Sequence, residues 1–323
     1  MTGDPRLSVS HAPFWRVGQS VTSRSLNALL ALSPAAVMGV VRFGGRAVGV
    51  MGLSVALCMA FELAANRLTR RPSTLHDGTA ALSGLILALL MPVSAPWWAV
   101  AVGAFVAMII GKHIFGGLGG NPFNPVLVAL AILTISWPSH FTFDAALAPY
   151  DFPFPGVDPL AALKHFGTAG IARFNEWDLF LGRQAGGIGA VSGAALLAGG
   201  VYLMLRGIVR WEISLSFLLG VAVTARVFYL FGNPALNAGP VFHILTGYTM
   251  MGAFFLAAEE SGSPVNFLPM LLFGFFAGFL TILIRSIGFH DDGVVYAILL
   301  MNVVQPLLDK IRPGALGRIG DHA

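Results

Sequence analysis

The chain has 323 residues, of which 56% are hydrophobic and only 11% are charged. Soluble domains carry about 25% charged residues, so this composition excludes an ordinary soluble protein and indicates one that lies within a lipid bilayer. The formal net charge of +4 gives no indication of nucleic-acid binding. Because Cys58 is the only cysteine, the chain can form no internal disulfide and cannot by itself hold an iron–sulfur cluster.

Ten apolar runs follow a polar segment at 1–26, which we expect to be cytoplasmic and to lack a cleavable signal peptide. Runs of this kind suit α-helices that cross about 30 Å of hydrocarbon. The sequence therefore predicts an all-α polytopic membrane protein with about ten transmembrane helices. In chain order, the expected spans are 27–43, 47–66, 79–93, 96–111, 122–138, 186–206, 212–231, 240–258, 267–287 and 293–308.

One long loop, 139–185, separates a first transmembrane half at 27–138 from a second half at 186–308, and a tail at 309–323 follows. Each half contains five expected spans. Because five is odd, the halves must insert in opposite directions, as two five-helix inverted repeats do. If both termini are cytoplasmic, twelve of the 19 Lys and Arg residues lie on the cytoplasmic side, in agreement with the positive-inside rule. The long loop is then extracytoplasmic.

Glycine-rich backbone with Asn-Pro steps interrupts the apolar pattern twice. The first stretch, GGLGGNPFNP, runs from Gly116 to Pro125, and the second, GNPALNAGP, runs from Gly232 to Pro240. Proline removes a backbone donor and disfavours helix at the residue before it. Non-helical backbone at membrane depth is tolerated where it is buried in protein or lines a cavity. These breaks therefore predict a ligand or ion site between the two halves.

Two ionisable side chains fall inside expected spans. Arg226 lies in the seventh span, where it either reaches the outer surface or a neighbouring subunit, or contacts a cofactor. His243 lies in the eighth span, where it is either a hydrogen-bonded core residue or an axial haem ligand facing His113. For each residue the sequence favours the structural alternative.

Two acidic positions flank helix ends. Asp77 precedes the third span, where it is expected to cap the helix. The functional alternative is that this helix start, with Thr79 and Ser83, faces a polar ligand. Glu259 and Glu260 end the eighth span, where negative charge opposes the helix dipole. That placement indicates a role in cation binding or in an interface with a partner.

Five segments resemble the RnfD/NqrB family of flavin-bearing membrane subunits, in an order and spacing that cover nearly the whole chain. They are DGTAALSGLILALLMPVSAPWW (77–98), GKHIFGGLGGNPFNPVLV (111–128), WEISLSFLLG (211–220), HILTGYTMMGAFFLAAEESGSP (243–264) and LIRSIGFHDDGVVYAILLMNVVQPLLD (283–309). The resemblance implies a complex of the bacterial cytoplasmic (inner) membrane that couples electron transfer between ferredoxin and NAD to pumping of Na⁺ or H⁺. It also implies partner subunits of the Rnf types A, B, C, E and G.

The resemblance departs from the family at the position expected to carry a covalent flavin. Family members usually attach FMN to a threonine of the outer loop, within a pattern such as D-G-x-S-x-A-T-P-L. The matching stretch here reads FPGVDPL, and Asp158 stands where the threonine is expected. A carboxylate does not replace the hydroxyl that forms the phosphoester. We therefore expect no covalently attached FMN.

Any flavin, FMN or riboflavin, is then expected to bind non-covalently between the halves, because Asn amides can satisfy flavin carbonyls and ring N–H groups. The same side chains can instead satisfy broken helix backbone. The alternative is a non-redox scaffold or ion-path subunit of a divergent complex. No catalytic residue and no metal ligand is expected. The candidate flavin-binding residues are Asp77, Thr79, Lys112, Asn121, Asn124, Asn233 and Asn237.

Overall fold

The computed structural model describes residues 20–147, 150, 152, 154–232, 238–259 and 261–311, and every regular element among these residues is a helix. The all-α prediction is confirmed. Four helices are long and apolar enough to cross a membrane by themselves, and several shorter apolar helices lie beside them. The chain is therefore built as a multi-pass membrane protein.

The first half contains five helical segments that match the first five expected spans. Ser20 caps the first of them by accepting a hydrogen bond from the backbone N–H of Ser23 at 3.1 Å. Asn124 caps the fifth, and Pro125 occupies its first turn, where a missing N–H costs nothing. The segments are α1 (Val21–Phe43), α2 (Gly45–Leu68), α3 (Thr79–Leu90), α4 (Trp97–Phe105) with its π-helical continuation η2 (Val106–His113), and α5 (Pro125–Ser136).

The second half repeats this order, but its third segment is broken. The expected span 240–258 forms two short helices and a π-helical turn, with non-helical backbone at Thr246 between the two helices. The remaining expected spans differ from the observed helices mainly in their boundaries. The segments are α9 (Gly193–Leu205), α10 (Trp211–Phe231), α11 (Pro240–Leu245) with α12 (Thr249–Met251) and η4 (Gly252–Leu256), α13 (Phe267–Ile287) and α14 (Val294–Leu308).

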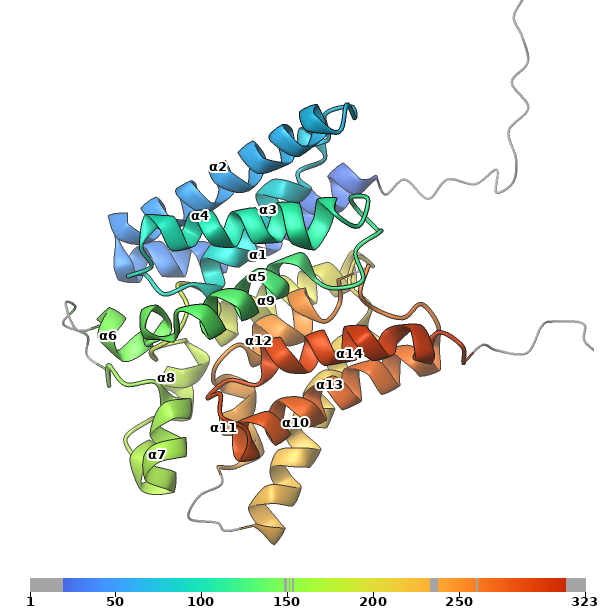
Figure 1. Cartoon of the computed structure of the whole chain (residues 1–323). Coiled ribbons are helices and arrows are strands. Elements are labelled where there is room, and N and C mark those ends of the chain that lie inside the picture. The colour runs from blue at the N-terminus through green and yellow to red at the C-terminus, as the bar shows by residue number, and fades with distance from the viewer. Residues whose placement is uncertain are drawn as a thin grey trace, which may run out of the picture.

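The loop between the halves adds short helices at one end of the bundle. Both ends of the described chain, near α1 and α14, lie at the opposite end (Figure 1). A chain that crosses the bundle an even number of times starts and finishes at the same end, so this placement agrees with the ten predicted spans. The short elements are η3 (Pro138–Phe141), α6 (Phe143–Leu147), α7 (Pro159–Ile171) and α8 (Glu176–Phe180), and η1 (Leu75–Asp77) lies ahead of α3.

The helices pack in a similar pattern within the two halves, and some corresponding helices of the two halves touch each other. In the first half α2 packs on α3 and α4, and in the second half α10 packs on α11 and α13. The first helices of the two halves, α1 and α9, touch each other, and so do the last helices, α5 and α14. Close approach depends on glycine, since a Cβ added at Gly84 would lie 2.7 Å from the Cα of Val55 in α2. This arrangement is the one that two inverted repeats produce.

The two glycine-rich breaks take different places in the order of the helices. The first precedes α5, the fifth helix of its half, whereas the second follows α10 and precedes the third segment of its half. A helix of 21 residues such as α10 carries the chain about 30 Å, so Gly232, the residue that ends α10, lies at the opposite end of this helix from Trp211. The expectation of one site beside both breaks stays a prediction. Asn233 and Asn237 lie outside the described residues.

Candidate functional site

A cavity of about 230 Å³ lies between the two halves, at the end of the bundle where α1, α3 and α5 begin. Its wall is mostly apolar, with a few polar groups on both halves, which is the usual composition of a small-molecule site. The glycine-rich loop before α5 contributes Leu118 and Gly119. The polar lining residues are Arg24, Ser25, Thr79, Ser83, Asn124, Glu259 and Ser261, and aromatic lining residues are Phe254 and Phe255.

Asn124 connects the halves at the edge of this cavity. Its Oδ1 accepts hydrogen bonds from the backbone N–H groups of Val126 and Leu127 at 3.0 and 3.2 Å, which caps α5. Its Nδ2 donates to the carbonyl of Leu256 in η4 at 3.3 Å. The backbone N–H of Asn124 in turn donates to Oδ1 of Asn302 in α14 at 3.3 Å. Asn124 therefore satisfies broken helix backbone and also lines the cavity.

Asn121 also crosses between the halves, although it does not line the cavity. Its Nδ2 donates to Oγ of Ser261 at 2.7 Å and to the carbonyl of Phe123 at 2.9 Å. Ser261 in turn donates to Oε1 of Glu259 at 3.1 Å. Asn121 thus holds in place two residues of the second half that line the cavity.

Asp77 and Thr79 form the start of α3. Oδ1 of Asp77 accepts hydrogen bonds from the backbone N–H of Thr79 at 2.8 Å and from its hydroxyl at 2.7 Å. The N-cap residue itself is Gly78, and Asp77 binds the first N–H of the helix from the position before it. Thr79 is only 8% exposed and lines the cavity, as the functional alternative for this helix start requires.

Lys112 points away from the expected ligand position and into the first half. Its Nζ lies 2.7 and 2.9 Å from the two carboxylate oxygens of Glu62, and 2.9 Å from the hydroxyl of Thr79. Both side chains of this ion pair are at least 95% buried. Lys112 therefore contacts the cavity only through Thr79, because the buried carboxylate holds its ammonium group.

The sequence prediction missed Glu62. A signal for it exists, because Glu62 is the one acidic residue of α2 and lies inside an expected span, where ionisable side chains usually have a function. Of the seven predicted site residues, the structure brings Asp77, Thr79, Lys112, Asn121 and Asn124 to one end of the bundle. Thr79 and Asn124 line the cavity, and the other three hold its lining residues in place.

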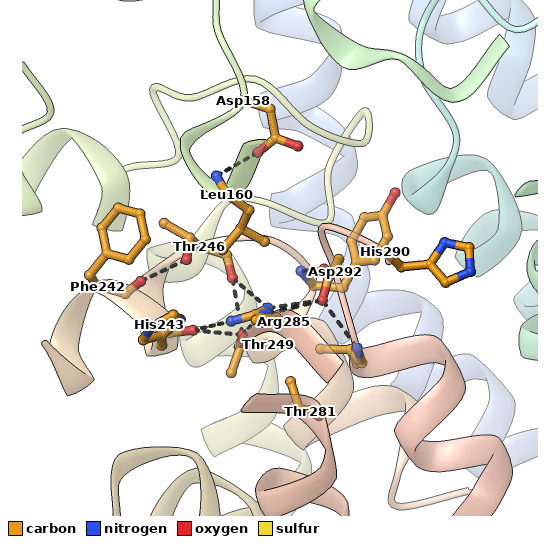
Figure 2. A network of polar contacts seen from close by, with 12 residues as sticks. Asp158, Leu160, Phe242, His243, Thr246, Thr249, Thr281, Arg285, His290 and Asp292 are labelled. Carbon is orange, nitrogen blue, oxygen red and sulfur yellow. Dashed lines mark hydrogen bonds and ion pairs between the residues drawn. The ribbon is translucent and has the colours of Figure 1, made fainter. Parts of the chain in front are cut away.

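A second buried cation, Arg285, lies where α13 ends and α14 begins, and Figure 2 shows its contacts. Arg285, near the end of α13, pairs with Asp292 at 2.9 Å and donates to the hydroxyl of Thr249 at 2.8 Å. It also donates to the carbonyl of His243 at 2.9 Å. Asp292 accepts a further hydrogen bond from the backbone N–H of Tyr248. These contacts satisfy the break between α11 and α12, so the second cluster holds irregular backbone together.

Lys112 and Arg285 occupy equivalent places in the two halves. Each lies near the C-terminal end of the fourth helical segment of its half, and each binds a threonine hydroxyl of the third segment and a carboxylate. The cavity is found at the Lys112 end. The two ends of the bundle therefore carry similar clusters of a cation, a carboxylate and a threonine.

Asp158 caps α7 in the loop between the halves, where its side chain accepts a hydrogen bond from the backbone N–H of Leu160 at 3.0 Å. Its own N–H donates to Oδ1 of Asp144 at 2.6 Å. Burial raises the pKa of Asp158 to about 7, and the carboxylates of Asp291, Asp292 and Asp144 add to the rise. The position expected to carry a flavin-bearing threonine is thus a partly buried helix cap near the Arg285 cluster (Figure 2).

Arg226, His243 and His113, the other ionisable residues considered in the sequence, do not line the cavity. Arg226 lies on the exposed surface of α10, with its guanidinium 5.7 Å from the ring centre of Tyr229. His243 is buried beside the Arg285 cluster and His113 lies beside Lys112, so the two cannot face one haem. Among the described residues there is no group of three His, Cys, Asp or Glu side chains that could hold a metal ion.

Comparison with known proteins gives a consistent result over nearly the whole chain. A sequence model of the NQR2, RnfD, RnfE family matches residues 8–317. The D-type subunit of the Na⁺-translocating ferredoxin:NAD⁺ oxidoreductase complex of Acetobacterium woodii is 36% identical over 306 residues, which cover 94% of this chain and 93% of the relative. The D-type subunit of the proton-translocating complex of Clostridium ljungdahlii is 34% identical, with 94% of each chain covered. The corresponding D-type subunit of the ion-translocating oxidoreductase complex of Shigella boydii is also 34% identical, over 96% of this chain and 98% of the relative.

Proposed function

The chain belongs to the NQR2, RnfD, RnfE family, and we propose that it is the D-type membrane subunit of an ion-translocating ferredoxin:NAD⁺ oxidoreductase complex. The similarity of nearly its full length to the D-type subunits of such complexes carries this proposal. The partners are subunits of the Rnf types A, B, C, E and G. The complex lies in the bacterial cytoplasmic membrane, with both termini of this chain in the cytoplasm. Both ends of the described chain, the start of α1 and the end of α14, lie at one end of the bundle, which supports the placement of both termini on the same side (Figure 1).

The cavity between the halves is the site of a non-covalent flavin, FMN or riboflavin. A flavin carries one- and two-electron chemistry, and the protein supplies its position and its electrostatic environment. Apolar side chains such as Phe254 and Phe255 suit the faces of a planar ring system. Ser83 offers a hydroxyl group, and Asn124 keeps the second hydrogen of its Nδ2 after the bond to Leu256, so both can bind the polar edge of the ring. The chemistry of the lining therefore fits this cofactor.

No covalent FMN is attached to this chain. The outer-loop position that resembles the flavin attachment motif is Asp158, which has a carboxylate in place of a hydroxyl and already caps α7 through Leu160. Electrons therefore reach or leave the cavity through partner subunits and not through a flavin fixed on this loop.

The experiment is flavin analysis of the purified complex, with ultraviolet detection on a denaturing gel and quantification of released flavin. The expected result is a dark band for this chain and released flavin beyond what the partners hold. Ser83→Leu, which fills the cavity, should remove that excess. Ser33→Leu, on the exposed surface of α1, is the matched control and should retain it. A fluorescent band at this chain's mass would refute the non-covalent assignment.

One observation favours a second candidate function, that of a non-redox scaffold or ion-path subunit. The Glu62–Lys112 pair is almost completely buried in a membrane-spanning bundle, and buried ionisable groups often mark ion pathways. This candidate predicts an intact, active complex in which the partners hold every flavin. Excess flavin that is lost in Ser83→Leu would reject it.

A further inference from the structure

The Glu62–Lys112 ion pair is hydrogen-bonded to further polar side chains on both sides. Thr74 donates its hydroxyl hydrogen bond to Oε1 of Glu62, and Asn66 donates to the hydroxyl of Thr74 at 2.8 Å. On the other side, the ammonium of Lys112 donates to the hydroxyl of Thr79 at 2.9 Å. A continuous chain of hydrogen bonds thus passes through the buried pair.

The chain of contacts joins the protein surface to the cavity. Thr79 donates its own hydroxyl proton to Oδ1 of Asp77 at 2.7 Å, and Asp77 is partly exposed beside the exposed His76. The same hydroxyl belongs to a residue that lines the cavity. Thr79 is therefore placed between solvent, the buried ammonium and any molecule in the cavity.

The other charged and titratable groups near the pair all lie at this end of the bundle. Cys58, one turn before Glu62 on α2, and His113, next to Lys112 on η2, both interact electrostatically with the pair. Arg71 interacts with His113 and donates to the carbonyl of Gly116 at 2.6 Å. The carboxylate at the surface end of the chain of contacts is Asp77.

We propose that Glu62 and Lys112 form a proton-loading site for the cavity, supplied from Asp77 through the hydroxyl of Thr79. In the resting state the pair is ionic and carries no net charge. When negative charge enters the cavity, one proton is added to the pair, which gains a charge of +1 and offsets it. This inference rests on the proposed function, because it names how the flavin site is charge-balanced.

The transfer conserves protons at each step. Lys112 passes a proton from Nζ to Oε2 of Glu62, which lies 2.7 Å away. The hydroxyl of Thr79 then turns its proton to the neutral Nζ, and a proton taken up from solvent by Asp77 passes to Oγ1 of Thr79. The net result is one proton moved from solvent to Glu62, with Asp77 again a carboxylate. No electron moves along this path, so the residues need no oxidant or reductant.

Proton loading has a direct spectroscopic signature, because only a protonated carboxyl group has a carboxylic acid C=O stretch. The experiment is redox-induced infrared difference spectroscopy on the purified complex, in sodium-free buffer. Reduction should produce a carboxylic acid band that shifts in D₂O. Glu62→Gln should abolish it, whereas Glu176→Gln, on the loop helix α8 at the other end of the bundle, should leave it unchanged.

Two further variants distinguish a loss of proton transfer from a loss of folding. Lys112→Met leaves a buried carboxylate without its partner and destabilises the chain, so the double variant Glu62→Gln/Lys112→Met, which is neutral at both positions, serves as the folded reference. It should retain flavin and lack the band. Asp77→Asn should keep the band but slow its appearance by a factor on the order of a hundred, the size expected when a positioned proton donor is lost.

The outcomes distinguish this inference from the function on which it rests. A band that persists in Glu62→Gln, or a complex with cavity flavin but no band, overturns the proton-loading site and leaves the flavin site intact. A band that disappears when sodium is added overturns it in favour of an alkali cation at Glu62. A complex without flavin in this chain overturns both proposals.

Discussion

Replacing Asn124 by alanine removes two separate stabilising contacts at the junction of the halves. The cap of α5 is lost, because Oδ1 no longer accepts from Val126 and Leu127. An N-cap contributes about 1 kcal/mol. The bond from Nδ2 to the carbonyl of Leu256 is lost as well, and a hydrogen bond of this kind contributes about 1 kcal/mol. The expected loss of stability is therefore about 2 kcal/mol, which lowers the Tm of a chain this long by about 3 °C.

The assay is thermal unfolding of the complex in detergent, with flavin retention measured in parallel. Asn124→Ser keeps a capping oxygen but cannot reach Leu256, so it should lose about half as much stability as Asn124→Ala. Asn266→Ala is the matched control, since Asn266 stands at the N-cap of α13 without a side-chain capping bond. It should change Tm very little. Equal losses in Asn124→Ala and Asn266→Ala would refute this reasoning, and so would a wild-type Tm for Asn124→Ser.

Three further predictions test other parts of the structure. Gly84→Ala forces its Cβ against the backbone of α2 and should cost about 1–3 kcal/mol, whereas Gly52→Ala, with open space around it, should be neutral or stabilising in the same unfolding assay. Arg285→Met leaves Asp292 without its cation and should destabilise the chain by about 3 kcal/mol; Arg285→Met/Asp292→Asn should recover part of this loss. Asp158 has a pKa raised to about 7, so it holds its proton in the folded state longer than in the unfolded one, and stability should fall as pH rises from about 4 to about 7. Asp158→Asn should flatten that fall in Tm measured across pH, and an unchanged slope would contradict the assignment.

The positions of the helices could be predicted from the sequence because hydrocarbon thickness fixes the length of an apolar span. The ninth expected span, 267–287, has the same bounds as α13, and most other spans differ by a few residues. The interruption of the expected span 240–258 at Thr246 could not be predicted from the apolar pattern. Arg285 and Asp292 satisfy the freed backbone at this break, and both lie more than 30 residues further along the chain.

The polar sites were predicted only where the residues are close in sequence. Asp77 and Thr79 lie two residues apart, and their local hydrogen bond follows from their spacing. Lys112 and Glu62 lie 50 residues apart, so nothing local indicates that they pair. The repeated Asn-Pro pattern gives no such indication either, because the first stretch precedes α5, the fifth segment of its half, whereas the second follows α10, the second segment of its half.

The two buried cations show why pseudo-symmetry alone does not locate function in this chain. At the Arg285 end, the carboxylate comes from a loop residue, Asp292, that is 16% exposed, and its remaining contacts go to backbone. At the Lys112 end, the carboxylate of Glu62 is 1% exposed and comes from inside a membrane-spanning helix. Burying a charge pair there is costly, and well-packed apolar residues could stabilise the same helices. The cavity is lined by Thr79, which the ammonium of Lys112 contacts, so a role in charge balance accounts for this buried pair better than packing does.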